Sequence, residues 1–381
     1  MKKLLIVNSF YTPTVVGGAE VSTQLLAEGL LSKYRVVILT TGPQRKGVIK
    51  EKINGIEVYR IPCLNFYWPA NKKNRNVIIK LFWHLLNLIN PLQFLLIKKL
   101  LSDISPNIVH TQNLSGVGTY IWCLSKKSKI YTVHTIRDYS LLAPVKNSIV
   151  NKMFSYINKK RSENVDYVVG ISQFILEKHK KSGFFPNSQE KVIHNIVNSK
   201  RYPRRQRVEG APLVIGYFGQ LEEIKGILIL VKAIRSINPK IVSKLIICGS
   251  GELENDLQVE ANKDSRIDFK GKLDLQSVYK LMAEVDLTIV PSLWEEPFGR
   301  VIIESYNQGT PVIAGNIGGI PEVVSNSSFL MPNVNENYIR EFIERFYYLK
   351  SDQYQNIVKE SYNASEKYQD NISMYLNIYP E

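Results

Sequence analysis

The sequence predicts an α/β protein of two domains, each built around a parallel sheet. The 381-residue chain is longer than the roughly 100–150 residues of a typical single domain. Short apolar runs bounded by turn residues alternate with stretches of helical spacing, which is the pattern of βαβ units. A stretch poor in large apolar residues and rich in Asn, Arg and Pro separates two series of such runs. We therefore expect two domains with a cleft between them.

The apolar runs give the expected strands. The first series predicts strands at 4–8, 36–40, 108–110, 130–134 and 167–170. The second series predicts strands at 213–219, 244–249, 267–269, 287–290, 311–314 and 329–331. The expected division is an N-terminal domain over 1–196, a linker over 197–212, a C-terminal domain over 213–365 and a helical tail over 366–381 that packs back on the N-terminal domain.

Composition indicates a cytoplasmic protein that does not cross a membrane. The cysteines Cys63, Cys123 and Cys248 are far apart and match no metal or disulfide spacing, so we expect a reducing compartment and no bound metal. The basic start Met1-Lys2-Lys3 leads into a run too short for a signal peptide. The apolar stretch 82–101 is interrupted by polar residues, which argues against a membrane-spanning helix.

The positive charge lies in the first half of the chain. Residues 1–210 hold 33 Lys and Arg against 11 Asp and Glu, whereas the rest holds 16 against 23. Nucleic acid and anionic lipid both fit such a charge, but no nucleic-acid-binding motif is present. The run Lys72-Lys73-Asn74-Arg75 leads directly into the apolar stretch 77–101. This pairing favours peripheral binding at an anionic membrane surface; a solvated basic surface above a core helix is the alternative.

Candidate site residues follow the predicted strands, where parallel sheets bind ligands. In the first half, Gly17-Gly18 enters a helix and allows close approach of a phosphate. His134 ends a strand and is followed by Arg137-Asp138, so it is a catalytic candidate. Alternatively, the glycines serve only to form the turn before the helix. The alternative for His134 is a structural role as a hydrogen-bonded core residue.

In the second half, Gly219 and Lys225 lie between a strand and a helix and offer backbone N–H groups and an ammonium to a diphosphate. A solvated lysine is the alternative for Lys225. Gly249 and Gly251 form a further turn at which a nucleotide can lie close to the backbone.

The most specific stretch is Glu295-Glu296-Pro297-Phe298-Gly299-Arg300, followed by Glu304 and by Gly309-Thr310-Pro311. Glu296 and Glu304 are eight positions apart, so both can reach one elongated ligand if a helix begins near Gly299. Carboxylates accept hydrogen bonds from sugar and ribose hydroxyls, while N–H groups near Phe298 and Gly299 suit a phosphate.

In this order along nearly the whole chain, these motifs resemble those of the retaining family 4 glycosyltransferases, which have the GT-B fold of two facing Rossmann-like domains. The resemblance implies a UDP- or GDP-sugar donor and metal-independent transfer with retention at the anomeric carbon. It also implies that Glu304 binds the ribose hydroxyls, Glu296 the donor sugar and Lys225 the diphosphate. His134 would face the transferred sugar, with Gly17-Gly18 approaching the diphosphate.

One residue departs from the family pattern, because members often carry Arg where this chain has Gln220. Arg300 or Arg137 is our hypothesis for a substitute cation. The acceptor we expect is a hydroxyl of a lipid-linked saccharide, and the expected process is bacterial surface polysaccharide synthesis. A sugar-nucleotide epimerase or phosphorylase, or a non-catalytic nucleotide-sugar-binding module, stays open as an alternative.

Overall fold

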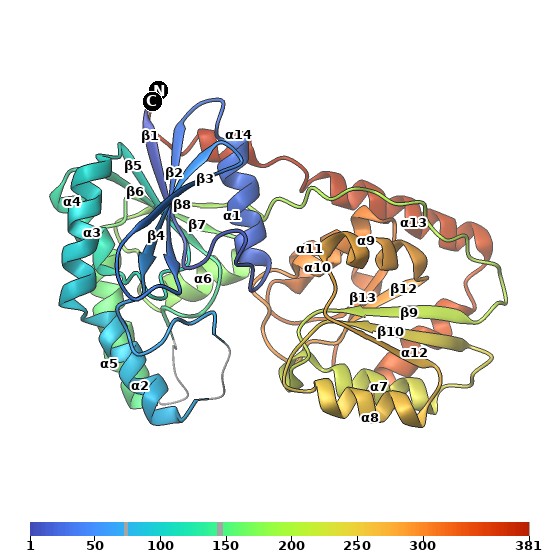
Figure 1. The fold of residues 1–381 in the computed structure, drawn as a ribbon. Helices are drawn as coiled ribbons and strands as arrows, with labels where there is room; N and C mark the ends of the chain where they lie inside the picture. The colour runs from blue at the N-terminus through green and yellow to red at the C-terminus, as the bar shows by residue number, and fades with distance from the viewer. Residues whose placement is uncertain (72–74, 143–147, 381) are drawn as a thin grey trace. The chain divides into compact units, whose positions relative to one another are not determined.

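The computed structural model describes residues 1–71, 75–142 and 148–380 and divides the chain into two compact α/β units (Figure 1). Unit 1 comprises Met1–Ile196 and Asn371–Glu381, and unit 2 comprises Val197–Asp370. Each unit has its own mainly parallel sheet and its own core. The predicted fold class is confirmed.

Unit 1 contains an eight-stranded sheet in the order β3-β4-β2-β1-β5-β6-β7-β8. The strands are β1 (Lys3–Val7), β2 (Arg35–Gly42), β3 (Ile49–Ile53), β4 (Ile56–Pro62), β5 (Ile108–Thr111), β6 (Tyr131–Ile136), β7 (Tyr167–Gly170) and β8 (Gln189–Val192). All pair in parallel except β3 with β4. The central strands read as continuous apolar runs because both faces of a parallel sheet are covered.

The antiparallel hairpin of β3 and β4 is absent from the strands we predicted. Its two-residue turn is Asn54-Gly55, and both residues have positive φ, 49° and 84°. Asn-Gly between strands is a strong hairpin signal, so the turn was readable in the sequence. Strand β3, Ile-Lys-Glu-Lys-Ile, lacks the apolar run that marks the predicted strands, because it lies at the edge of the sheet and buries little surface.

The helices of unit 1 cover both faces of its sheet. They are α1 (Gly18–Gly29), α2 (Val77–Leu88), α3 (Pro91–Ile104), α4 (Tyr120–Lys127), α5 (Ser148–Ser162), α6 (Gln173–Lys181) and α14 (Ile372–Leu376). Helices α1 and α14 lie on one face, where Leu26 and Tyr375 share a core with Leu4 and Ile38, and α3 and α4 lie on the other (Figure 1).

The end of the chain completes the core of unit 1. Tyr379 is buried, and its hydroxyl lies 2.7 Å from Nδ1 of His110 on β5. The Asn371 amide donates to the carbonyl of His194 at 2.8 Å. These bonds tie residues that are 269 and 177 positions apart, so the segment after Asp370 is a structural part of unit 1.

Unit 2 contains a six-stranded parallel sheet in the order β11-β10-β9-β12-β13-β14. Its strands are β9 (Leu213–Phe218), β10 (Val242–Cys248), β11 (Ile267–Gly271), β12 (Leu287–Val290), β13 (Val312–Gly315) and β14 (Leu330–Met331). Its α-helices are α7 (Ile227–Ser236), α8 (Glu254–Lys263), α9 (Leu275–Glu284), α10 (Arg300–Asn307), α11 (Ile320–Val323), α12 (Glu336–Tyr347) and α13 (Ser351–Glu366). Short 3-10 turns span Glu223–Lys225 and Ser327–Phe329. Helices α7, α8 and α12 lie on one face of the sheet, and α9, α10 and α13 lie on the other (Figure 1).

The segment 197–212, which we expected as a linker, lies entirely within unit 2. The Asn307 amide donates to the carbonyl of Ser199 at 2.7 Å, and the Gln308 amide donates to that of Lys200 at 2.9 Å. Arg207 donates to the carbonyl of Tyr347 at 2.6 Å. Its polar composition therefore supplies hydrogen bonds to α10 and α12, and the chain passes between the units at Ile196–Val197 and again at Asp370–Asn371.

One helical stretch among the described residues, Val77–Ile104, is long and apolar enough to cross a membrane by length and composition alone, and only 22% of its most apolar window is buried. The stretch is broken into α2 and α3, because Pro91 begins the second helix and Asn90 caps it. The stretch exposes large apolar side chains, among them Ile78, Ile79, Phe82, Ile89, Leu92 and Leu95, together with Lys80, Lys98 and Lys99. The basic run Lys72-Lys73-Asn74 before it lies outside the described residues.

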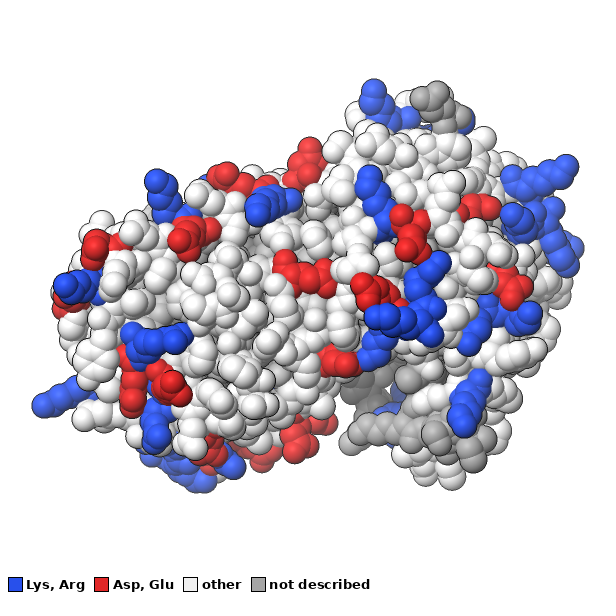
Figure 2. All heavy atoms as spheres, turned by 180° about the vertical axis from the view of Figure 1, so that it is seen from behind, with Lys and Arg blue, Asp and Glu red and all other residues white. Residues whose placement is uncertain are grey.

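The charge is distributed as the sequence indicates. Figure 2 shows one face of the molecule, on which Lys and Arg side chains gather over unit 1 whereas acidic and basic side chains alternate over unit 2. Unit 2 contains ion pairs such as Arg235 with Glu260 and Arg266 with Asp264.

Candidate active site

The loop between β12 and α10 carries Glu296, and it is anchored on both sides. The Leu293 N–H donates to the carbonyl of Ile224 at 2.9 Å, and the Gly319 N–H donates to the carbonyl of Glu296 at 2.7 Å. The Ser292 hydroxyl donates to Oε1 of the Glu296 carboxylate at 3.0 Å. The backbone and the side chain of Glu296 are thus both held at the carboxyl end of the sheet.

Lys225 and Glu296 form an ion pair in this place. Nζ of Lys225 lies 2.6 Å from Oε1 of Glu296, and their side chains are only 17% and 15% exposed. The ammonium also lies 5.4 Å from the ring centroid of Trp294, within cation–π range. An ammonium and a carboxylate fixed side by side can receive a phosphate oxygen and a sugar hydroxyl of one ligand.

A second pair lies on α10. The Arg300 Nε donates to Oε1 of Glu304 at 2.8 Å, one helical turn apart, and the Tyr279 hydroxyl on α9 lies 3.4 Å from the same oxygen. Burial and the negative charge of Glu304 raise the pKa of Tyr279 to about 12, so this hydroxyl stays protonated at neutral pH. The buried Glu304 carboxylate is therefore both paired with a cation and hydrogen-bonded, which offsets the cost of its burial.

Helix α10 begins as the sequence indicated, directly after Gly299. Gly299 is the N-cap with φ of 96°, a left-handed conformation that favours glycine. The Phe298 side chain is buried, and its ring centroid lies 5.9 Å from that of Tyr368. The N-terminal end of a helix carries partial positive charge, so the start of α10 favours an anion.

Three of the glycines predicted to lie near a nucleotide, Gly219, Gly249 and Gly251, differ in their surroundings. A Cβ on Gly249, where φ is 158°, would meet the Gly219 carbonyl oxygen at 1.8 Å, and one on Gly251 would meet that of Leu221 at 2.3 Å. Gly249 and Gly251 are thus required for close packing of the loops after β9 and β10. A Cβ on Gly219 would meet nothing closer than 3.6 Å, and this residue is exposed, as is Gln220.

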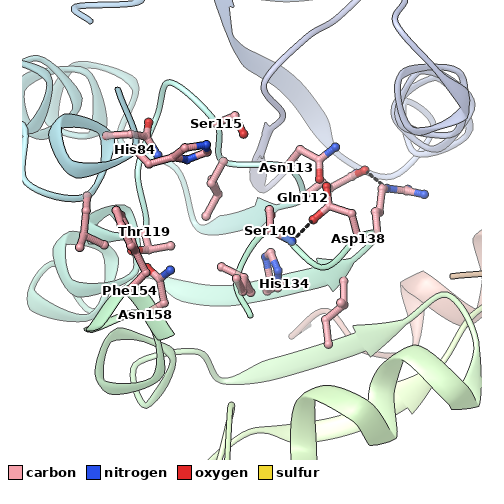
Figure 3. A pocket seen from close by; sticks show the side chains of 16 residues that line it. His84, Gln112, Asn113, Ser115, Thr119, His134, Asp138, Ser140, Phe154 and Asn158 are labelled. Carbon is pink, nitrogen blue, oxygen red and sulfur yellow. Dashed lines mark hydrogen bonds between the residues drawn. The ribbon is translucent and has the colours of Figure 1, made fainter. Parts of the chain in front are cut away.

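In unit 1, His134 on β6 lies at a pocket (Figure 3). Its Nδ1 is 2.9 Å from the Thr111 hydroxyl, and its ring stacks on Phe185 with centroids 5.4 Å apart. Burial holds the pKa of His134 well below its ordinary value of 6.5. The imidazole is therefore neutral at pH 7, and it can exchange hydrogen bonds with a ligand without carrying a charge.

The pocket beside His134 is lined mainly by polar side chains from several elements. His84 and Asn87 come from α2, Asn113 and Ser115 from the loop after β5, and Asp138 from the loop after β6 (Figure 3). None of these except His134 and Asp138 lies in a motif that drew attention in the sequence. The pocket brings them together from α2, β5 and β6, whose order in space only the sheet topology fixes.

The charged residues after β6 form hydrogen bonds within unit 1. Arg137 is buried, and its guanidinium donates to Gln112 at 2.5 Å and to Asn195. Asp138 accepts the N–H of Ser140 at 2.8 Å.

The Gly17-Gly18 loop is fixed by Glu20 of α1. The Glu20 carboxylate accepts the N–H of Gly17 at 2.7 Å and that of Val16 at 3.3 Å. Burial raises the pKa of Glu20 above its usual value although these bonds act against the shift. The N–H of Gly17 is thus occupied, and Gly18 is the first residue of the helix.

No group of three or more His, Cys, Asp or Glu side chains among residues 1–71, 75–142 and 148–380 could hold a metal ion.

Solved structures show the same fold. Sucrose-phosphate synthase from Thermosynechococcus elongatus aligns with a TM-score of 0.75 over 99% of this chain and 97% of its own, at 20% identity. HepE from Anabaena, in complex with UDP and glucose, aligns with a TM-score of 0.70 over 99% and 98% at 19% identity. The chain therefore has the GT-B fold.

The family follows from the sequence. The model for "Glycosyltransferase Family 4" matches residues 16–201, and that for "Glycosyl transferases group 1" matches residues 198–364. An "uncharacterized 42.6 kDa protein in cps region" of Klebsiella pneumoniae is 32% identical over 87% of this chain and 88% of its own length. An uncharacterized glycosyltransferase of Methanocaldococcus jannaschii is 25% identical over 85% and 83%. The chain belongs to the family 4 (group 1) glycosyltransferases.

Proposed function

We propose that this glycosyltransferase moves a sugar from a UDP- or GDP-sugar to a hydroxyl of a lipid-linked saccharide, with retention at the anomeric carbon and without a metal ion. The observation that carries the donor part is the pair of carboxylate–cation contacts in unit 2, Lys225 with Glu296 and Arg300 with Glu304. Both lie just beyond the carboxyl ends of parallel strands, where such sheets bind nucleotides.

The proposed roles follow from charge. In the reaction the bond between the anomeric carbon and the diphosphate oxygen breaks, so positive charge develops on the sugar ring and negative charge on the diphosphate. Lys225 and the first N–H groups of α10 stabilise the leaving diphosphate. Glu296 binds the donor sugar, and Glu304 binds the ribose. The backbone around Gly219, Gly249 and Gly251 lies along the nucleotide.

Transfer requires the acceptor hydroxyl to lose a proton as its oxygen bonds to the anomeric carbon. Same-face attack lets an oxygen of the departing diphosphate take that proton, so that no carboxylate nucleophile is needed. His134, neutral in its pocket, donates or accepts a hydrogen bond with the transferred sugar, and Gly17-Gly18 approaches the diphosphate. In this proposal Lys225 and the positive end of α10 supply the charge at the diphosphate that a metal ion supplies in other transferases.

The acceptor assignment rests on α2. One face of this helix lines the pocket with His84, Asn87 and Leu88, and the opposite face exposes Ile78 and Phe82. Polar pocket side chains suit a saccharide, and exposed apolar ones beside basic residues suit the surface of an anionic membrane. We place the enzyme in the cytoplasm at the inner face of the cell membrane, in surface polysaccharide synthesis; the cps-region relative in Klebsiella pneumoniae supports this setting.

The test is transfer itself. Purified protein is incubated with single UDP- and GDP-sugars and a membrane lipid extract, with and without EDTA, and the anomeric configuration of the product is read by NMR. We expect a lipid-extractable product with the donor's configuration, unaffected by EDTA. A soluble sugar nucleotide of changed configuration would indicate an epimerase, and donor binding without turnover would indicate a binding module.

A further inference from the structure

Arg300 and Tyr279 contact the same atom of Glu304. Both reach Oε1, at 2.8 Å and 3.4 Å, and they come from different helices, α10 and α9. None of the described residues donates a hydrogen bond to the other oxygen, Oε2. The carboxylate is therefore held through one oxygen while the second is left for a ligand.

The side chains of Arg300, Glu304 and Tyr279 are nearly buried. Side-chain exposure is 12% for both Arg300 and Glu304, and Tyr279 is 4% exposed. Burying a carboxylate is unfavourable unless a cation pairs with it and hydrogen bonds satisfy it. Arg300 supplies that cation, and its planar guanidinium with the Tyr279 hydroxyl fixes the plane of the carboxylate.

We propose that Arg300 and Tyr279 are positioning residues that hold Glu304 to accept the vicinal hydroxyls of the donor's ribose. This rests on the proposed donor site. The sequence suggested that Arg300 replaces, at the diphosphate, the Arg that family members often carry where this chain has Gln220. The present proposal instead places Arg300 at Glu304. The arrangement makes the site selective for ribonucleotides over 2′-deoxyribonucleotides.

Two comparisons of ligands separate these tasks. A residue that positions Glu304 contributes to binding of the ribose, so its loss weakens the binding of UDP but hardly changes the binding of 2′-deoxy-UDP. A residue that binds the diphosphate affects UDP and 2′-deoxy-UDP equally, and affects UMP much less. Isothermal titration of wild type and Arg300→Leu with UDP, UMP and 2′-deoxy-UDP, or with the guanine series if GDP binds, measures both.

For wild type we expect UDP to bind about tenfold or more tighter than 2′-deoxy-UDP, as for loss of a hydrogen bond to a charged group. In Arg300→Leu we expect this preference to fall to about twofold, with UMP weakened as much as UDP. Tyr279→Phe should lower the preference less, because the hydroxyl contact is longer, and Arg300→Lys should retain part of it.

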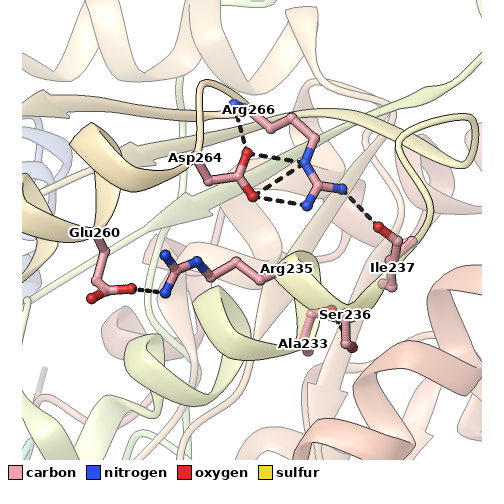
Figure 4. Close-up of polar contacts among 7 residues, drawn as sticks. All are labelled: Ala233, Arg235, Ser236, Ile237, Glu260, Asp264 and Arg266. Atoms are coloured by element: carbon pink, nitrogen blue, oxygen red, sulfur yellow. Dashed lines mark hydrogen bonds and ion pairs between the residues drawn. The ribbon is translucent and has the colours of Figure 1, made fainter.

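The control is Arg235→Leu, which breaks a comparable ion pair between α7 and α8 in unit 2 (Figure 4). It should leave all three affinities unchanged, and circular dichroism checks the folding of each variant. If the affinities for UDP and 2′-deoxy-UDP fell equally in both Arg300→Leu and Arg300→Lys, the positioning role would be wrong. The proposed donor site would still stand. Absence of UDP and GDP binding in folded wild type would overturn the inference together with the proposed donor site.

Discussion

At the scale of single residues, Lys225 is the cation on which the proposed transfer depends most. Its ammonium is fixed by Glu296 at 2.6 Å and is little exposed. Lys225→Ala should lower kcat/KM for the donor by about 100-fold or more, the usual cost of removing one group that stabilises a developing anion. Steady-state assays measure this, with Lys263→Ala on α8 as the control because its partner Glu260 lies in a surface pair. Equal losses in the two variants would argue against a role at the diphosphate.

A second residue-scale prediction concerns the buried contact between Tyr379 and His110. Tyr379→Phe removes the hydroxyl 2.7 Å from Nδ1 of His110 and leaves a buried ring nitrogen without this partner. The free energy of unfolding should fall by about 1–3 kcal/mol, the cost of an unsatisfied buried polar group. Urea denaturation measures it, against Tyr348→Phe, whose side chain is exposed. An equal effect of both substitutions would contradict the structural role of the C-terminal segment.

At the scale of elements, the proposed contact with a membrane depends on helix α2. Ile78→Ser with Phe82→Ser removes apolar surface from its outward face and leaves His84 and Asn87 in place. Sedimentation with anionic liposomes at low salt should drop severalfold relative to wild type, since interfacial binding scales with buried apolar area. Tyr348→Ser, an exposed aromatic change in unit 2, should not alter it. Equal recovery of wild type with neutral and anionic liposomes would contradict the electrostatic contribution.

The sequence predicted the central strands of both sheets and missed the hairpin of β3 and β4, although β4 is largely buried. The central parallel strands were readable because both of their faces are covered. The edge strand β3 has the polar sequence Ile-Lys-Glu-Lys-Ile, and only its turn Asn54-Gly55 marked it. For the segment 197–212, composition indicated a linker between the domains, but its arginines and carbonyls bond to α10 and α12.

For the site, the order of motifs along the chain indicated which loops carry chemistry, but not which side chains meet. Lys225 and Glu296 are 71 positions apart, and their contact depends on β9 and β12 being neighbours in the sheet. Tyr279 belongs to no motif, so its contact with Glu304 follows only from the packing of α9 against α10. The Arg300–Glu304 pair, at i and i+4, could have been read from helical spacing.

At the scale of the whole molecule, buried histidines make stability depend on pH. Burial lowers the pKa of His110 to about 3 and those of His84 and His179 to about 4, and holds that of His134 well below 6.5. Below pH 6.5 the unfolded chain binds protons that the folded chain excludes, so the free energy of unfolding falls as pH decreases from about 6.5 to about 4, by up to ~1.4 kcal/mol per pH unit for each imidazole.

All four of these histidines belong to unit 1, so its unfolding should respond first. Thermal unfolding followed at pH 7.5, 6.5, 5.5 and 4.5 measures the effect. Carboxylates with lowered pKa values, such as Asp264, act only as pH falls through about 4. A melting temperature that stays constant from pH 6.5 to 4.5 would contradict the burial of neutral imidazoles.

The central claim is that unit 2 holds the nucleotide-sugar donor through Lys225, Glu296 and Glu304. Hydrogen–deuterium exchange of the whole chain with and without UDP or GDP tests it most directly, because bound ligand protects the backbone that it contacts. The account predicts that one nucleotide protects residues 219–226 and 291–304 and that Glu304→Ala abolishes this protection at the same concentration. Protection confined to other parts of the chain, or unchanged in Glu304→Ala, would contradict it.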